Sequence, residues 1–192
     1  MKKTPRMILL SLVLALMLPF FSLNAQTETF KQGDLVFSAG FGIGATYGAY
    51  WGSYYNTTVP PIFISGDYCL REDLGPGNLG VGGIIAYSAY KYEPSPDWGY
   101  KYSDLFIGAR GTYHFTDLVD KMDLYGGITL GAEILTDKGY GEYSGYEYST
   151  NGSSALVELF AGARYYFTDN LGVMSELGYG IAWLKLGVAF KL

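Results

Sequence analysis

Cysteine and histidine occur once each among the 192 residues. The sequence therefore excludes a disulfide framework and a zinc site of the usual Cys and His type. Charge is also scarce: 16% of the residues are charged, and acidic residues outnumber basic ones by 18 to 13. A nucleic-acid-binding surface needs a basic excess, and a disordered chain needs fewer apolar residues than the 49% found here. We expect a folded chain with no metal, no other cofactor and no nucleic-acid partner.

Long apolar runs are scarce as well. One run, residues 7–18, follows basic residues at the N-terminus. A membrane-spanning helix needs about 20 apolar residues, whereas a shorter run behind basic residues is typical of a secretory signal peptide. We predict that residues 1–25 are a signal peptide for Sec-dependent export, cleaved near Ala25. No later run is long enough for a transmembrane helix.

The rest of the chain alternates between apolar and polar residues with a period of two. Such alternation is typical of β-strands with two different faces. The alternating segments are longer than an average soluble strand. They predict strands over residues 34–51, 62–71, 79–90, 102–115, 122–135, 154–167, 171–179 and 184–192.

Charged residues fall on one face of these segments and aliphatic residues on the other. In the last segment, for example, Lys185 lies between Leu184 and Leu186. An Arg or Lys facing lipid at mid-membrane costs about 2–4 kcal/mol, so the pattern indicates aliphatic side chains toward lipid and charges toward a lumen. A lipocalin-like carrier would have the opposite arrangement, with an apolar interior. The predicted lumen polar network consists of Asp67, Arg71, Asp104, Arg110, Asp123, Glu133, Glu158, Arg164, Glu176, Lys185 and Lys191.

The predicted fold class is therefore all-β: an eight-stranded antiparallel up-and-down transmembrane β-barrel over residues 34–192, after a short periplasmic lead at residues 26–33. The connections after the second, fourth and sixth segments are short, and those after the first, third and fifth are longer. Short periplasmic turns and long extracellular loops are typical of outer-membrane barrels. We also expect the prolines that follow the signal peptide to lie between strands, where no ladder N–H is needed.

A repeated motif carries a family resemblance. Phe106–Arg110 followed by Phe115–Asp117 recurs as Phe160–Arg164 followed by Phe167–Asp169. This pattern resembles the small outer-membrane β-barrel family of the OmpA and OmpX type, which is porin-family-like. The resemblance implies the outer membrane of a Gram-negative bacterium, insertion by the barrel-assembly machinery, contact with outer-membrane lipid and lipopolysaccharide, and a monomer in the cell envelope.

The C-terminus departs from the family pattern. Members of such families usually end in Phe, whereas this chain ends in Leu192, with Phe190 two positions earlier. We take Phe190 and Leu192 as the C-terminal insertion signal.

The lumen charges predict a closed barrel. Acidic and basic side chains in a barrel barely wide enough for its own side chains must pair, because an unpartnered buried charge costs several kcal/mol. We therefore expect a non-enzymatic protein that serves envelope integrity or surface interaction through extracellular loops. Some related barrels modify lipids, so an outer-membrane lipid-modifying enzyme is an alternative. His114 is the one histidine available as its base.

The longest predicted loop is rich in tyrosine and acidic residues. Tyrosine offers a broad contact area at low entropic cost, so this loop suits binding of an extracellular protein or glycan. Its candidate contact residues are Tyr140, Tyr143, Tyr146 and Tyr148. A surface adhesin acting through this third loop is thus a second alternative.

Overall fold

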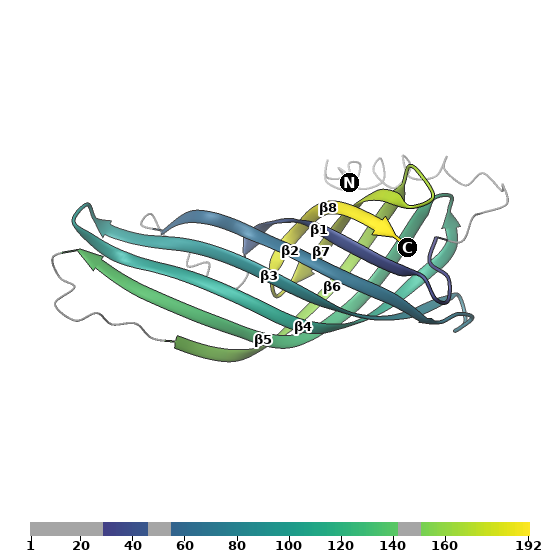
Figure 1. The fold of residues 1–192 in the computed structure, drawn as a ribbon, viewed down its shortest axis with the longest axis horizontal. Coiled ribbons are helices and arrows are strands. Elements are labelled where there is room, and N and C mark those ends of the chain that lie inside the picture. Colours follow the sequence, from purple (N-terminus) through teal and green to yellow (C-terminus); the bar gives the residue numbers. More distant parts are fainter. Residues whose placement is uncertain (1–28, 46–54, 142–150) are drawn as a thin grey trace, which may run out of the picture.

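A computed structural model describes residues 29–45, 55–141 and 151–192, which form one closed antiparallel β-barrel (Figure 1). Each strand pairs with the next along the chain, and β8 pairs with β1 to close the sheet. The strands are β1 (Leu35–Ala45), β2 (Tyr55–Arg71), β3 (Gly77–Ser95), β4 (Trp98–Val119), β5 (Met122–Gly141), β6 (Asn151–Tyr166), β7 (Leu171–Tyr179) and β8 (Ala182–Lys191). The predicted fold class is confirmed. No helix in the described part of the chain is long and apolar enough to cross a membrane.

The outer face of the barrel is aliphatic and aromatic. Ile64, Leu159 and Leu177 are 59%, 60% and 66% exposed, although each lies within a regular strand. Side chains of successive strand residues point to opposite faces, so the residues next to each of these three along its strand point into the lumen. An apolar exterior around a charged interior reverses the usual arrangement of a water-soluble barrel. It is the arrangement of a barrel surrounded by lipid.

The strands on one side of the barrel extend further than the sequence predicts. The predicted long loop after the third strand is wrong: β3 and β4 continue to a tight turn at Pro96 and Asp97, with Ser95 paired to Trp98. Two tyrosines outside the predicted strands, Tyr92 and Tyr100, are paired strand residues instead. Tyr90 stacks on its cross-strand partner Tyr102 with 4.9 Å between the ring centroids. Such cross-strand aromatic pairs stabilise a sheet.

These extensions continue the barrel sheet past one mouth of the barrel (Figure 1). We call it the protruding sheet: residues 55–61 of β2, 88–95 of β3, 98–104 of β4 and 136–141 of β5. Among the described residues, the pairing of β1 with β2 stops at Phe41 and Ile62, and the start of β2 pairs with β3. The predicted end of the first strand, at residue 51, lies outside the described residues, as does the predicted signal peptide.

Three of the prolines predicted between strands lie inside them. Pro60 and Pro61 lie in β2, where the register with β3 shifts between Val59 and Ile62, and Pro94 lies where the register of β3 with β4 shifts. A bulge interrupts the ladder, so a residue without an N–H is tolerated there. The expectation that all these prolines lie between strands did not allow for such bulges. Pro76 and Pro96 do lie in turns.

The lipid-facing assignment predicts how the outer face responds to charge. We expect Leu159→Arg to lower the free energy of unfolding by about 2–4 kcal/mol, because its guanidinium would face hydrocarbon. Ser153→Arg is the matched control, since Ser153 is an exposed residue on the same face of β6 nearer its extracellular end. It should cost at most about 1 kcal/mol. Urea titration of folding into phospholipid vesicles measures both. Equal effects of the two arginines would contradict a lipid-facing β6.

Candidate functional site

The lumen contains a continuous chain of alternating acidic and basic side chains. It crosses the barrel through side chains of β2, β4, β5, β6, β7 and β8, each at most 3% exposed. We call this set the ion chain. Its members, in order of contact, are His114, Asp123, Arg164, Asp67, Arg110, Glu176, Lys185 and Glu158.

The two arginines share Asp67 at the centre of the ion chain. Arg110 Nε lies 3.2 Å from Asp67 Oδ1, and Arg164 donates through Nη2 to Asp67 Oδ2. Each guanidinium also reaches a second carboxylate: Arg110 Nη2 lies 2.7 Å from Glu176 Oε1, and Arg164 Nη1 lies 3.2 Å from Asp123 Oδ2. A planar fork of donors suits this bridging role. Arg164 donates to both of its acids, and Arg110 donates to Glu176 while its Nε forms an ion pair with Asp67.

A lysine bridges two carboxylates at one end of the ion chain. Lys185 Nζ lies 2.7 Å from Glu158 Oε1 and 2.7 Å from Glu176 Oε2. Thr129 donates to the other oxygen of Glu158 at 3.0 Å. At the other end, His114 Nδ1 lies 2.7 Å from Asp123 Oδ1. No acid in the ion chain is left without a cationic or hydrogen-bonded neighbour, as the cost of an unpaired buried charge requires.

Aromatic rings fill the space beside the cations. The guanidinium of Arg110 lies 4.3 Å from the centroid of the Phe160 ring, and that of Arg164 lies 4.4 Å from the Tyr125 ring. Tyr125 also donates its hydroxyl hydrogen to Glu176 at 2.8 Å. These rings pack against the guanidinium groups and help to hold them in place.

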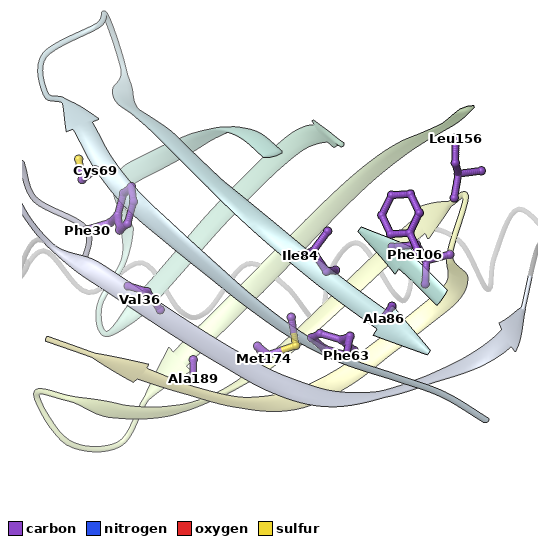
Figure 2. Packing of buried hydrophobic residues seen from close by; sticks show 11 residues of the cluster. Phe30, Val36, Phe63, Cys69, Ile84, Ala86, Phe106, Leu156, Met174 and Ala189 are labelled. Carbon is purple, nitrogen blue, oxygen red and sulfur yellow. The ribbon is translucent and has the colours of Figure 1, made fainter. Parts of the chain in front are cut away.

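Apolar side chains cover both ends of the ion chain. Figure 2 shows Phe30 and Cys69 at one end of the barrel and Phe106 and Leu156 at the other, all buried. A cavity beside Phe106 and Leu156 measures about 20 Å³, enough for roughly one water. The predicted lumen polar network contained only charged residues. Cys69, Phe106 and Leu156 share their strand parity with those charges, and that parity is the signal that locates them.

Four predicted lumen residues lie outside the ion chain. Arg71 is exposed at the end of β2, past a register shift after Cys69, so it does not point into the lumen. Lys191 lies at the periplasmic mouth, with its Nζ 3.9 Å from Asp34. Asp104 and Glu133 are buried toward the extracellular end. There they accept hydrogen bonds from Ser88 at 3.5 Å and Ser154 at 3.1 Å, respectively.

The N-terminal segment inserts into the periplasmic mouth, which sequence reasoning missed. The ring of Phe30 is fully buried and stacks on His114 with 3.7 Å between centroids. Asn78 donates to the Phe30 carbonyl at 2.7 Å, which fixes the segment to β3. A single aromatic residue before the first strand has no periodicity, so the alternation that located the strands gave no signal for it.

His114 lies in an arrangement that resembles a catalytic triad. Its Nε2 lies 2.9 Å from Thr112 Oγ1 and its Nδ1 lies 2.7 Å from Asp123 Oδ1, the order of hydroxyl, imidazole and carboxylate used in acyl transfer. All three side chains are at most 2% exposed, Phe30 covers the imidazole, and Arg164 shares Asp123. The hydroxyl is therefore buried, and the imidazole and the carboxylate both have further contacts inside the barrel.

The protruding sheet positions the one candidate tyrosine that the structure describes. Tyr140 of β5 donates its hydroxyl hydrogen to Glu93 Oε1 of β3 at 2.6 Å. The tyrosine ring crosses Gly99 of β4, where a Cβ would come within 2.9 Å of the Tyr140 hydroxyl oxygen, so a larger residue would displace it. This hydrogen bond lowers the pKa of Glu93 and raises that of Tyr140. The other candidates, Tyr143, Tyr146 and Tyr148, lie outside the described residues.

The C-terminal residues lie at the periplasmic end of β8. Phe190 is 46% exposed and Leu192 is 64% exposed, so both face outward from the barrel. The backbone N–H of Leu192 donates to the Leu35 carbonyl at 2.9 Å, which joins the end of the chain to β1. Their role as an insertion signal stays a prediction.

Comparisons with known proteins identify the fold. No family model and no curated protein matches the sequence. Among solved structures, the N-terminal β-barrel domain of OprF from Pseudomonas aeruginosa is 18% identical, with a TM-score of 0.51 over 84% of this chain and 98% of that chain. Ail, the attachment invasion locus protein of Yersinia pestis, is 16% identical, with a TM-score of 0.52 over 84% and 100%.

A further structural neighbour is the outer membrane protein OprG from Pseudomonas aeruginosa. It is 14% identical, with a TM-score of 0.54 over 85% of this chain and 97% of that chain. The chain therefore has the fold of the small eight-stranded outer-membrane β-barrels of Gram-negative bacteria, as its motifs suggested. At these identities the likeness concerns the fold alone.

The ion chain predicts a large penalty for removing one of its cations. We expect Lys185→Met to lower the free energy of unfolding by about 3–5 kcal/mol, because Glu158 and Glu176 lose the cation they share. Adding Glu158→Gln should recover part of that loss. Lys191→Met is the control on the same strand. It should cost at most about 1 kcal/mol, since its contact with Asp34 is long and partly exposed. Urea titration measures all three, and a Lys185→Met variant no less stable than the control would refute the bridging role.

Proposed function

We propose that this chain is a monomeric, non-enzymatic protein of the Gram-negative outer membrane with a closed lumen, and that its extracellular end serves envelope integrity or surface interaction. The observation that carries the proposal is the ion chain, because it fills the lumen with paired charges whose separation is costly. The aliphatic outer face supports the placement in a membrane. Insertion by the barrel-assembly machinery after Sec export, and contact with lipopolysaccharide, belong to the same proposal.

The closed lumen separates this function from that of a pore. An eight-stranded barrel has an interior just wide enough for side chains. Here that interior holds Arg110, Arg164 and Lys185, each bound to two carboxylates, with apolar layers beyond them. An ion crossing the lumen would have to break several of these pairs together. The fixed charges serve to stiffen the barrel and not to conduct.

Surface interaction through the extracellular end is the more specific form of the proposal. The protruding sheet supports it, since β3, β4 and β5 continue past the barrel mouth as a paired sheet. The alternative of an adhesin acting through the third loop rests on Tyr140, Tyr143, Tyr146 and Tyr148. Among the structural neighbours, Ail of Yersinia pestis was also solved in complex with the heparin analogue sucrose octasulfate, at 16% identity and a TM-score of 0.54.

Conductance tests the closed lumen. Purified protein inserted into planar bilayers should give no stable channel of nanosiemens size, because the ion chain leaves no continuous water path. Heat-modifiable migration on electrophoresis of the same sample checks that the barrel is folded. Steady openings of that size from a folded sample would overturn the proposal.

Lipid analysis tests the non-enzymatic part of the proposal. Membranes from cells that express the wild type, Thr112→Val or His114→Ala should have the same acylation of lipid A and of phospholipids as cells without the gene. The physical reason is that Phe30 and Arg164 close the Thr112, His114 and Asp123 arrangement to substrate. Thr112→Val is the more informative variant, since it removes the hydroxyl nucleophile with little change of shape. An acylation change that appears with the wild type and disappears with Thr112→Val would establish the enzyme instead.

A further inference from the structure

Three lysines form a row across the outward face of the protruding sheet. Lys91 of β3 pairs directly with Lys101 of β4, and Lys101 pairs directly with Lys138 of β5. Side chains directly opposite one another lie on the same face, with Cβ atoms roughly 5 Å apart, and like charges there destabilise the sheet. We call Lys91, Lys101 and Lys138 the lysine row. Its placement costs stability unless an anion lies against it.

The protein itself neutralises little of this charge. Lys91 Nζ lies 3.9 Å from Glu93 Oε1, and both side chains are more than a third exposed. Lys101 Nζ lies 5.3 Å from the centroid of the Tyr140 ring. Within the described ranges, no carboxylate lies at ion-pair distance from Lys101 or Lys138. The row therefore keeps an excess of positive charge.

The lysine row borders a groove of about 290 Å³ on this face. The next row on this face toward the membrane consists of Ala89, Ser103 and Thr136, which also line the groove. Their small side chains leave the hollow, and two of them bring hydroxyl groups to it. An anion held by the lysines would thus meet hydrogen-bonding groups on its membrane side.

The row below these small residues is apolar. Tyr87 pairs with Leu105, and Leu105 pairs with Ile134, on the same outward face. Each lysine lies four residues beyond the apolar residue of its own strand. With a rise of about 3.3 Å per residue and a strand tilt near 40°, that separation is roughly 10 Å along the membrane normal. The head-group layer of a leaflet is about 5–8 Å thick, and lysine side chains reach toward it.

The order of the three rows therefore follows the chemistry of a membrane lipid. From the membrane outward it runs from apolar side chains, through small and hydroxyl side chains, to cations. Acyl chains, the polar linkage and a phosphate group occur in the same order. A free phosphate ion or a soluble polysaccharide would contact the cationic and hydroxyl rows, whereas a lipid would contact the apolar row as well.

We propose that the lysine row and the groove beneath it bind the phosphate-bearing head group of a lipid in the outer leaflet. The lysines pair with the phosphate oxygens, Ser103 and Thr136 donate to the polar linkage, and Tyr87, Leu105 and Ile134 contact the acyl chains. This site rests on the proposed placement in the outer membrane. In this proposal the protruding sheet binds lipid at the membrane surface.

Binding of lipid A to the full-length mature protein in detergent micelles tests the site. Native mass spectrometry would compare bis-phosphorylated lipid A with lipid A from which both phosphates have been removed. We expect Lys101→Gln with Lys138→Gln to weaken binding of the phosphorylated lipid about 30-fold. That change corresponds to about 1 kcal/mol for each lysine near an anionic membrane surface. The dephosphorylated lipid should bind the wild type no better than this variant binds the phosphorylated lipid.

A matched variant controls for the loss of charge. Lys31→Gln with Lys121→Gln removes two exposed lysines that line a pocket at the opposite end of the barrel, and it should bind as the wild type does. Lys101→Arg with Lys138→Arg should retain binding. Heat-modifiable migration confirms that each variant is folded, so a failure of the lipid site stays distinct from a failure of the barrel.

Four results would overturn the proposal. The first is equal binding by the Gln double variant and the wild type, and the second is equal binding of the two lipids. The third is displacement of the lipid by inorganic phosphate at low millimolar concentration, which would make the site one for free anions. The last is tighter binding of a sulfated heparin oligosaccharide than of lipid A, which would assign the lysine row to an extracellular polysaccharide.

Discussion

The pairing of buried charges across the lumen is the interaction on which this structure depends. A sheet surrounded by hydrocarbon must close, because an open edge would leave its amides without partners. Closure places every second side chain inside an interior that holds little but side chains. A charge in that interior has lost its hydration and needs an opposite charge at hydrogen-bond distance. Asp67, which joins both arginines, and Lys185, which joins Glu158 and Glu176, provide this in both directions.

The same constraint explains which parts of the fold the sequence predicted. Alternation with a period of two locates a strand and its lipid face, and it placed β7 within the observed bounds of Leu171–Tyr179. Alternation does not predict which individual charges pair with one another. Arg164 meets Asp67 97 residues away because of the register around the whole barrel. The register shift after Cys69 also turns Arg71 out of the lumen, and no local pattern announces it.

Other parts of the candidate site depend on contacts that leave no periodic pattern in the sequence. The extension of β3 and β4 passes through Pro94 and ends at Pro96, residues that locally favour a turn. Pairing with a long neighbouring strand overrides that preference, since stacked tyrosines stabilise the hairpin. Phe30 inserts into the barrel because His114 offers a stacking surface there. Both features depend on residues far apart in the sequence, so they become visible only in the folded chain.

The rigid lumen and the protruding sheet are parts of one hydrogen-bonded structure. β4 carries Arg110 in the ion chain and Lys101 in the lysine row, on opposite faces of an unbroken strand. Its register with β5 continues from Arg110 opposite Thr129 to Lys101 opposite Lys138 without a shift. The ion-paired Arg110 and the exposed Lys101 are therefore joined by one continuous ladder. In the proposed lipid site, this continuous register keeps the surface rows in their order from the membrane outward.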